Sequence, residues 1–330
     1  MYLQFDNNNP SVWRLGSKEN PVYIATTDFP FVQKFDIDSL ETLELLKPVY
    51  GVNTISGLTH WQREVGTDNS LYLMGKNEDN GTFVELQRYK PENSNFSDPE
   101  IIAKIAVNRN SMVHSFSITK HYAIIFNYPV VLDTGVCIIE NHFHGLECLK
   151  TLENEFTDIF IVNLKTEEVM KFATEPIFSI HHINAYETVE SEIVVDLVTN
   201  DPMFLKEYSL MNNILNPPEF SNGSITMSNE IMRYSINLQT NSVTPSRFPN
   251  YILGPNRRYV NNFDLPTINE NYRGREVCIY LLLEEGTYFF ICLNAFKCIN
   301  ISISSIALFT GSARTTIQER HWSKRMYVMH

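Results

Sequence analysis

Short apolar runs separated by polar turns extend along most of this chain. Two of the clearest, at residues 158–164 and 192–198, are rich in Ile, Val and Phe and have polar residues at their ends, which is typical of β-strands. The second run hardly alternates between apolar and polar positions, so we expect a strand that is buried on both faces. Further strands are predicted at 22–26, 31–35, 82–89, 101–107, 122–131, 167–172, 233–238, 281–293 and 301–309. Many short strands with little helix between them predict an all-β sandwich, barrel or propeller.

Turn and helix signals complete this pattern. The dipeptide Asn80-Gly81 lies between two apolar runs and predicts a β-hairpin. Residues 201–215 are the best helix candidate, because Asp201 can cap the first turn and Pro202 suits its first position. The chain is therefore expected to be a β protein with a short helical insertion.

Composition narrows the classes of function. The 330 residues are enough for one large domain or two ordinary ones. A formal net charge of -12, without a cluster of Lys and Arg, argues against a nucleic-acid partner. The five cysteines are an odd number without a Cys-x-x-Cys pair. They favour reduced thiols in a cytoplasmic protein over a disulfide framework or a zinc site.

Targeting and membrane signals are weak. The first ten residues contain no basic segment and no apolar core, so no signal peptide is expected. The longest apolar window, 277–296, is interrupted by Glu284 and Glu285 and does not suit a transmembrane helix. The sequence therefore predicts a soluble, cytoplasmic protein.

The adjacent pair His181-His182 is the first candidate for chemistry. It lies in the link between two predicted strands, where a neutral imidazole can direct a ring nitrogen into a cavity while the strands hold its backbone. On the pair alone, the simpler interpretation is a surface pair, or one packed histidine beside one that contacts water.

The longer strings around these histidines change that interpretation. The string His-His-Ile-Asn-Ala-Tyr-Glu at 181–187 resembles the signature of the carotenoid cleavage oxygenase family, in the animal form that includes the retinoid isomerase of the eye. Residues 112–119, around His114, and the run that follows at 122–126 resemble a second string of that family. The two strings occur in the family's order, which makes the resemblance more specific than either string alone.

Two further strings resemble the same family. His60 lies before Gly66-Thr67 and a Leu-Met-Gly strand, although Leu58-Thr59 replaces the family's His-Pro. Taken alone, His60 would be a partly buried loop histidine. The fourth string covers 263–269 and 272–274, with Asp264 where the family carries Glu.

The resemblance implies a β-propeller fold, seven-bladed in the family, with short helical insertions. It covers residues from about 13 to about 280, and 281–330 form a divergent tail of what we expect to be one domain, 1–330. The family's opening segment and its distal Phe-His-Gly string are not found, so the propeller is expected to be truncated at both ends.

The resemblance also implies a metal site. Family members hold Fe(2+) with four neutral histidines, three of which are oriented by carboxylates, and this ligand set suits a ferrous ion that reacts with dioxygen. The matching ligands here are His60, His114 and His181. Asp28 and Asp264 occupy positions of the orienting carboxylates. Asp28 is equally well explained as a turn residue before Pro30. Asp264 is about one methylene shorter than Glu and needs a shifted backbone or a bridging water.

The fourth ligand is not identified. His142-Phe143-His144-Gly145 mimics the family's distal string but precedes the His181 string, so we interpret it as a loop. His321 and His330 lack the family context. Three histidines alone would also suit zinc or copper.

Three functions remain open from the sequence. The first is an iron(II)-dependent dioxygenase that cleaves a double bond of a carotenoid or apocarotenoid to give retinal-like aldehyde or ketone products, with peripheral membrane contact. The second is a truncated, inactive relative that binds a retinoid or carotenoid. The third is an all-β interaction protein with structural histidines, which is hard to reconcile with four family strings in order.

Overall fold

The computed structural model describes residues 11–17, 19–28, 32–46, 54–56, 60–90, 99–133, 149–200, 202, 229–247, 263–268, 270–276, 279–284 and 287–292. Within these ranges the chain is built from strands. Apart from one helical residue, Pro202, helical structure there is confined to the single turn η3 (Glu270–Tyr272). The all-β prediction is therefore confirmed. No helix in the described part of the chain has the length and apolarity needed to cross a membrane.

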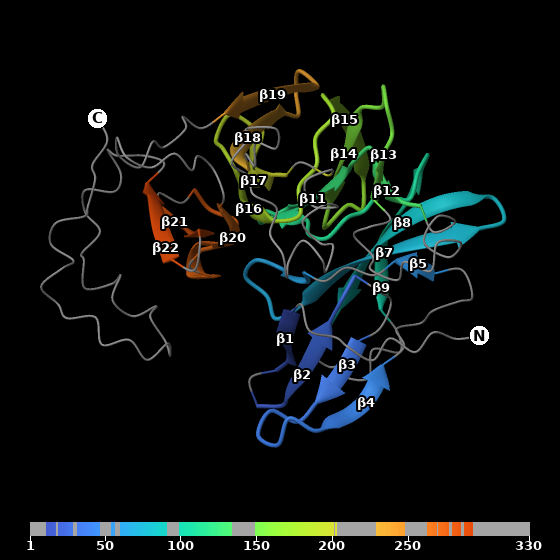
Figure 1. Cartoon of the computed structure of the whole chain (residues 1–330), viewed down its shortest axis with the longest axis vertical. Helices are drawn as coiled ribbons and strands as arrows, with labels where there is room; N and C mark the ends of the chain where they lie inside the picture. Colours follow the sequence, from blue (N-terminus) through green and yellow to red (C-terminus); the bar gives the residue numbers. More distant parts are fainter. Residues whose placement is uncertain are drawn as a thin grey trace, which may run out of the picture.

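The first two sheets come from the first third of the chain (Figure 1). The first sheet contains β1 (Ser11–Gly16), β2 (Pro21–Thr26), β3 (Val32–Phe35) and β4 (Thr42–Leu46). The second contains β5 (Thr54–Ser56), β7 (Ser70–Glu78), β8 (Gly81–Tyr89) and β9 (Glu100–Val107), with β6 (Gln62–Arg63) also paired to β7.

The later sheets follow the same plan. The third contains β10 (Ser117–Ile118), β11 (Tyr122–Asn127), β14 (Thr157–Asn163) and β15 (Val169–Thr174), beside a ribbon of β12 (Val130–Leu132) and β13 (Leu149–Thr151). The fourth contains β16 (His182–Glu187), β17 (Glu192–Thr199), β18 (Glu230–Asn237) and β19 (Ser242–Arg247). The fifth contains β20 (Phe263–Thr267), β21 (Ile279–Glu284) and β22 (Thr287–Cys292).

The connectivity is that of a propeller. All pairings between these strands are antiparallel. The sheets succeed one another along the chain and are arranged in an arc in Figure 1. Successive antiparallel sheets of about four strands are the repeating unit of a β-propeller.

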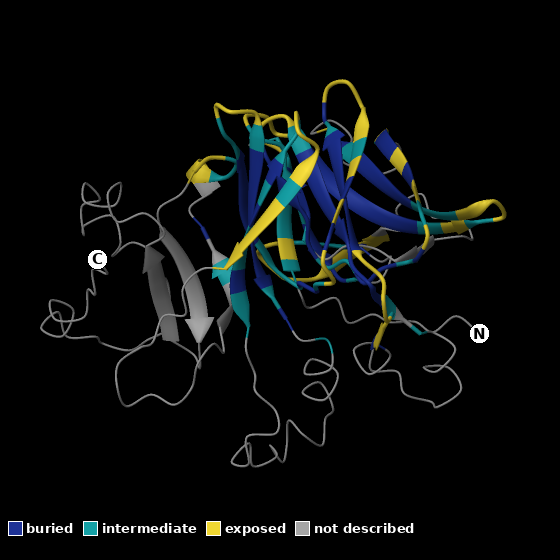
Figure 2. Ribbon diagram, turned by 90° about the horizontal axis from the view of Figure 1, so that it is seen from above, coloured by how far each residue is buried: buried dark blue, intermediate teal, exposed yellow. Residues whose placement is uncertain are grey.

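The third sheet is packed on both faces, which explains its continuous apolar runs. In β11, Ala123 and Ile125 belong to one hydrophobic cluster, shared with the first and second sheets. Ile124 and Phe126 belong to another, shared with the fourth sheet. Because successive side chains of a strand point to opposite faces, this sheet lies between two cores. Figure 2 shows buried residues along the inner strands, and exposed ones in the turns and along outer strands such as β19. The predicted two-sided burial of 192–198 is also confirmed, since 193–198 are all buried.

Two predicted strands are each divided in the structure, and the predicted hairpin is present. The run 122–131 forms two strands rather than one, because the chain breaks at Tyr128-Pro129, where proline has no N–H for a ladder. The run 281–293 likewise divides into β21 and β22. The hairpin predicted at Asn80-Gly81 is present, with Glu78 paired to Gly81. Most of the predicted helix 201–215 and all of 301–309 lie outside the described residues.

Candidate metal centre

Three histidines from three different sheets meet at one point. His60 lies just before β6, His114 shortly before β10, and His181 immediately before β16. Their ligand nitrogens all lie within 4.8 Å of one another. The ring centroids are 4.8 to 5.2 Å apart, and the rings meet edge to face. The structure therefore brings together the three histidines that the family resemblance singled out.

The donor set fits a transition-metal ion. Two nitrogens bound to one ion at about 2.1 Å lie at most about 4.2 Å apart. Small inward rotations of the three rings would therefore bring their nitrogens to binding distance of one ion. Burial, followed by the charges of His114 and His181, lowers the pKa of His60 to about 2. His60 is therefore neutral at physiological pH, which a metal-binding imidazole must be.

Asp28 fixes the orientation of one of these rings. Its Oδ2 lies 2.8 Å from Nδ1 of His114, whose side chain is 13% exposed. A carboxylate only accepts hydrogen bonds, so in the neutral ring the proton sits on Nδ1 and the lone pair on Nε2. This contact is the one that the imidazole-orienting interpretation of Asp28 requires, and the part of Asp28 in a metal site stays a prediction.

Replacing Asp28 by alanine is expected to weaken metal affinity by about 10- to 100-fold, because His114 loses the acceptor that selects its tautomer. Asp28→Asn keeps the side-chain volume but not the charge, and its metal affinity should lie between that of Asp28→Ala and that of the unaltered protein. Chelator competition with Co²⁺ measures both variants. Equal affinity in all three proteins would show that Asp28 has no part in the site.

Side chains next to the three histidines brace their backbones. Gln62, two residues after His60, donates from Nε2 to the carbonyl of Phe116, two residues after His114, at 2.9 Å. Ser115 donates from Oγ to the carbonyl of Ile180 at 2.7 Å and accepts from the N–H of His182 at 2.9 Å. These bonds enclose the peptide of His181. Neither Gln62 nor Ser115 stands out in the sequence, because a hydrogen bond to a distant backbone leaves no motif.

His182, the second histidine of the pair, is not part of this cluster. Its Nδ1 lies 2.7 Å from Oγ of Ser117, and its Nε2 lies 2.8 Å from the hydroxyl of Tyr128. Burial, and then the charge of His181, lowers the pKa of His182 to about 3. Its two ring nitrogens are thus occupied by the protein, and it packs edge to face on Phe126. The pair consists of one clustered histidine and one structural histidine.

The polar residues that end the same string hold β16 to its neighbours. Asn184 accepts from the N–H of Gly274 at 3.2 Å and donates to the carbonyl of Arg275 at 2.8 Å. Glu187 accepts from the backbone N–H of His121 at 3.0 Å and lies 2.8 Å from its Nδ1. The string therefore fixes its own strand against both the third and the fifth sheets.

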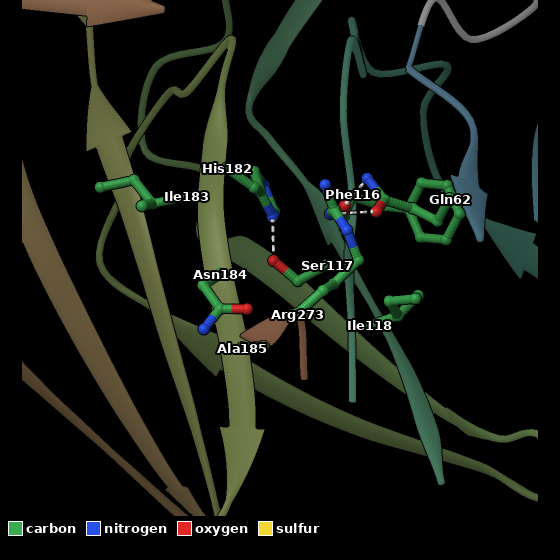
Figure 3. Close-up of a pocket in the computed structure, with 9 residues that line it drawn as sticks. All are labelled: Gln62, Phe116, Ser117, Ile118, His182, Ile183, Asn184, Ala185 and Arg273. Atoms are coloured by element: carbon green, nitrogen blue, oxygen red, sulfur yellow. Dashed lines mark hydrogen bonds between the residues drawn. The ribbon is translucent and has the colours of Figure 1, made fainter. Parts of the chain in front are cut away.

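A small, mainly polar pocket opens beside these braces (Figure 3). In Figure 3, Arg273 extends toward Gln62, and its Nη1 donates to Oε1 of Gln62 at 2.7 Å. His182 and Ser117 form another wall, and Asn184 lies below them. The pocket is where the turn after η3 meets the strands that follow the three histidines.

The other predicted residues have different outcomes. Asp264 lies in β20, where its backbone pairs with Leu283, but its side chain lies outside the described part of the structure. The same holds for His142, His144, His321 and His330. A fourth ligand and the role of Asp264 therefore stay predictions.

Successive antiparallel sheets with a histidine cluster between them define the class: a β-propeller with three histidines that converge from separate sheets. Comparison with known families agrees, since the profile described as "Retinal pigment epithelial membrane protein" (RPE65) matches residues 6–313. The chain belongs to this family.

Curated relatives cover a similar part of the chain. The β,β-carotene 15,15'-dioxygenase of Gallus gallus is 27% identical over 191 residues, which is 53% of this chain and 36% of that protein. The carotenoid isomerooxygenase of Galleria mellonella is 27% identical over 201 residues, which is 58% of this chain and 38% of that protein. The chain thus spans well under half the length of these relatives.

Solved structures support the fold. A variant of the Synechocystis apocarotenoid oxygenase superposes with a TM-score of 0.62 at 15% identity, covering 88% of this chain and 61% of that one. The cobalt-substituted form of the same enzyme gives a TM-score of 0.58 at 16% identity, covering 82% and 57%. Together with the sheet order, this likeness confirms the predicted β-propeller class.

Proposed function

We propose that this chain carries the metal site of an iron(II)-dependent dioxygenase that cleaves a double bond of a carotenoid or apocarotenoid. The observation that carries the proposal is the meeting of His60, His114 and His181 within 4.8 Å, in a member of a family whose matched relatives include β,β-carotene 15,15'-dioxygenases. Fe(2+) is the ion that we assign, because imidazole ligands suit ferrous iron and the reaction needs a metal that can activate oxygen.

The proposed reaction balances without an acid or a base. One dioxygen molecule and one carbon–carbon double bond give two carbonyl groups, with one oxygen atom on each carbon. When bound, Fe(2+) supplies the redox chemistry that lets dioxygen react with the polyene. No proton is transferred in the net reaction, so a catalytic triad or a pair of carboxylates is not required.

The chain's own residues hold the metal in this proposal. His60 contributes a neutral ring nitrogen, and His114 contributes Nε2 while its Nδ1 donates to Asp28. Ser115 encloses the peptide of His181. Rigid support of this kind keeps each ligand close to its productive geometry. A fourth ligand, as in the family, is part of the proposal and is not assigned to a residue.

The setting that we propose follows from the substrate. Carotenoids are almost entirely apolar and partition into membranes, so a cytoplasmic protein that acts on them is expected to make peripheral contact with one leaflet. We also propose that residues 1–330 form one propeller domain with a divergent tail at 281–330. Co-sedimentation with phosphatidylcholine vesicles, with and without β-carotene, measures the membrane contact.

Turnover of β-carotene by the iron-loaded protein tests the function. With ¹⁸O₂, label is expected in both carbonyl products, which are separated by chromatography and identified by mass spectrometry. The oxygen of a product aldehyde exchanges with water. Short incubation limits this exchange, and a parallel experiment in H₂¹⁸O measures it. Iron binding without product, combined with tight binding of retinal, would instead identify an inactive retinoid-binding relative.

A further inference from the structure

The chain segments that carry the three histidines are joined in pairs, and each pair is joined by different hydrogen bonds. Gln62 joins the segments of His60 and His114. Ser115 joins the segments of His114 and His181. The segments of His60 and His181 are joined through a third piece of chain, the turn at residues 270–276, which contacts both of them.

Arg273 connects this turn to the His60 segment. Its guanidinium donates from Nη1 to Oε1 of Gln62 at 2.7 Å, and Gln62 is 6% exposed. The amide of Gln62 thus accepts from Arg273 at one end and donates to Phe116 at the other. A side-chain amide held at both ends cannot rotate freely, so Arg273 helps to fix the Gln62 side chain, two residues from His60.

Asn184 connects the same turn to the His181 segment. Its amide binds the backbone of Gly274 and of Arg275 from β16, three residues after His181. The turn also lies close to Val65, which follows β6, and glycine permits this contact: the φ of Gly274 is +74°, and a Cβ there would lie 2.8 Å from Cγ2 of Val65. Only glycine combines that backbone conformation with that proximity.

We propose that the turn 270–276 is a positioning element of the metal centre, in which Arg273 and Asn184 set the spacing between His60 and His181. The inference rests on the proposed function only in taking the three histidines as a metal site. It assigns to Arg273 a role through Gln62 rather than a contact with metal or substrate. Because the turn lies far along the chain from both histidines, it joins their segments only in the folded protein.

Cobalt binding tests this role without relying on oxygenase activity. Arg273→Met removes the donor and keeps an apolar stem, and is expected to weaken Co²⁺ affinity about tenfold, the lower range for residues that support a ligand. The visible absorption bands of bound Co²⁺ should also change, because they report ligand geometry. Arg273→Lys retains one donor and should recover part of the affinity. Gly274→Ala should displace the turn without removing any hydrogen-bonding side chain. Its Co²⁺ affinity and absorption bands should therefore resemble those of Arg273→Met.

Lys76→Met is the control. Lys76 is a partly buried cation of β7 whose Nζ lies 2.6 Å from Oε2 of the buried Glu85, whereas β7 pairs with the strand that follows His60 only at Ser70 and Leu71. Lys76→Met should lower stability to urea without changing the cobalt spectrum. Wild-type affinity and spectrum in both Arg273→Met and Gly274→Ala would overturn the inference. If the unaltered protein binds no Co²⁺, the proposed metal site itself fails, which is a different result.

Discussion

Replacing His114 or His181 by alanine is expected to abolish metal binding while leaving the β-sheets intact. Each change removes one of three nitrogens that lie within 4.8 Å of one another. Loss of a supporting partner alone weakens metal affinity by about 10- to 100-fold, so loss of a ligand should exceed that range. Elemental analysis of the purified variants gives the metal content, and far-ultraviolet circular dichroism reports the fold.

His121→Ala provides the control for this experiment. His121 lies in the turn between β10 and β11 and is paired with Glu187, and its side chain is 56% exposed. It lies outside the cluster, so its removal should leave the metal content unchanged. Full metal content in His114→Ala or in His181→Ala would remove the assignment of that residue. Equal loss in His121→Ala would indicate a general effect on folding.

Replacing Arg233 by methionine is expected to destabilise the protein by about 3–5 kcal/mol, the range for removing one partner of a buried ion pair. Arg233 binds Asp196 through two parallel bonds, with Nε to Oδ1 at 2.7 Å and Nη2 to Oδ2 at 2.8 Å. The side chain of Asp196 is completely buried. Without the guanidinium, the carboxylate must either stay charged in an apolar region or take up a proton, and both are unfavourable.

Urea denaturation measures this effect, and Lys104→Met is the control. Lys104 contacts Glu78 at 2.7 Å, but its side chain is 39% exposed. Exposed ion pairs contribute about 0.2–1 kcal/mol, so its loss should be small. A change of under 1 kcal/mol in Arg233→Met would show that Asp196 is stabilised by other means. The pair lies in the sheet that begins at His182, and its loss should loosen the support of His181.

The strand content of the fold could be predicted from the sequence because period-two and continuous apolar runs report burial. Residues 193–198 are all buried, and the charged residue among them, Asp196, is paired with Arg233. The break at Tyr128-Pro129 is one of the two places where a predicted strand divides. There the apolar run continues through the break, because Tyr128 is fully buried although it lies outside a strand. Hydrophobicity alone does not separate these two situations.

The candidate site was only partly predictable. Family strings singled out His60, His114 and His181, and the structure brings them together. Their role as ligands stays a prediction. Within the adjacent pair, the direction of each ring is set by tertiary contacts, and the bonds of His182 to Ser117 and Tyr128 are invisible in the sequence.

The supporting residues could not be predicted, since their partners are distant. Gln62 and Arg273 are 211 positions apart in the chain, and Ser115 binds backbone atoms, which every residue carries. Asp28 was ambiguous for a similar reason. A carboxylate before a proline turn and one that orients an imidazole look the same until the distance to His114 is known.

The iron content of the protein, purified and reconstituted with Fe(2+) under anaerobic conditions, tests the central claim most directly. About one iron per chain is expected, and it should be lost in His181→Ala and retained in His121→Ala, because only His181 belongs to the cluster. A folded β protein with iron near zero after reconstitution would contradict it. The convergence of the three histidines would then reflect descent from an iron enzyme, and retinoid binding would be the property to measure.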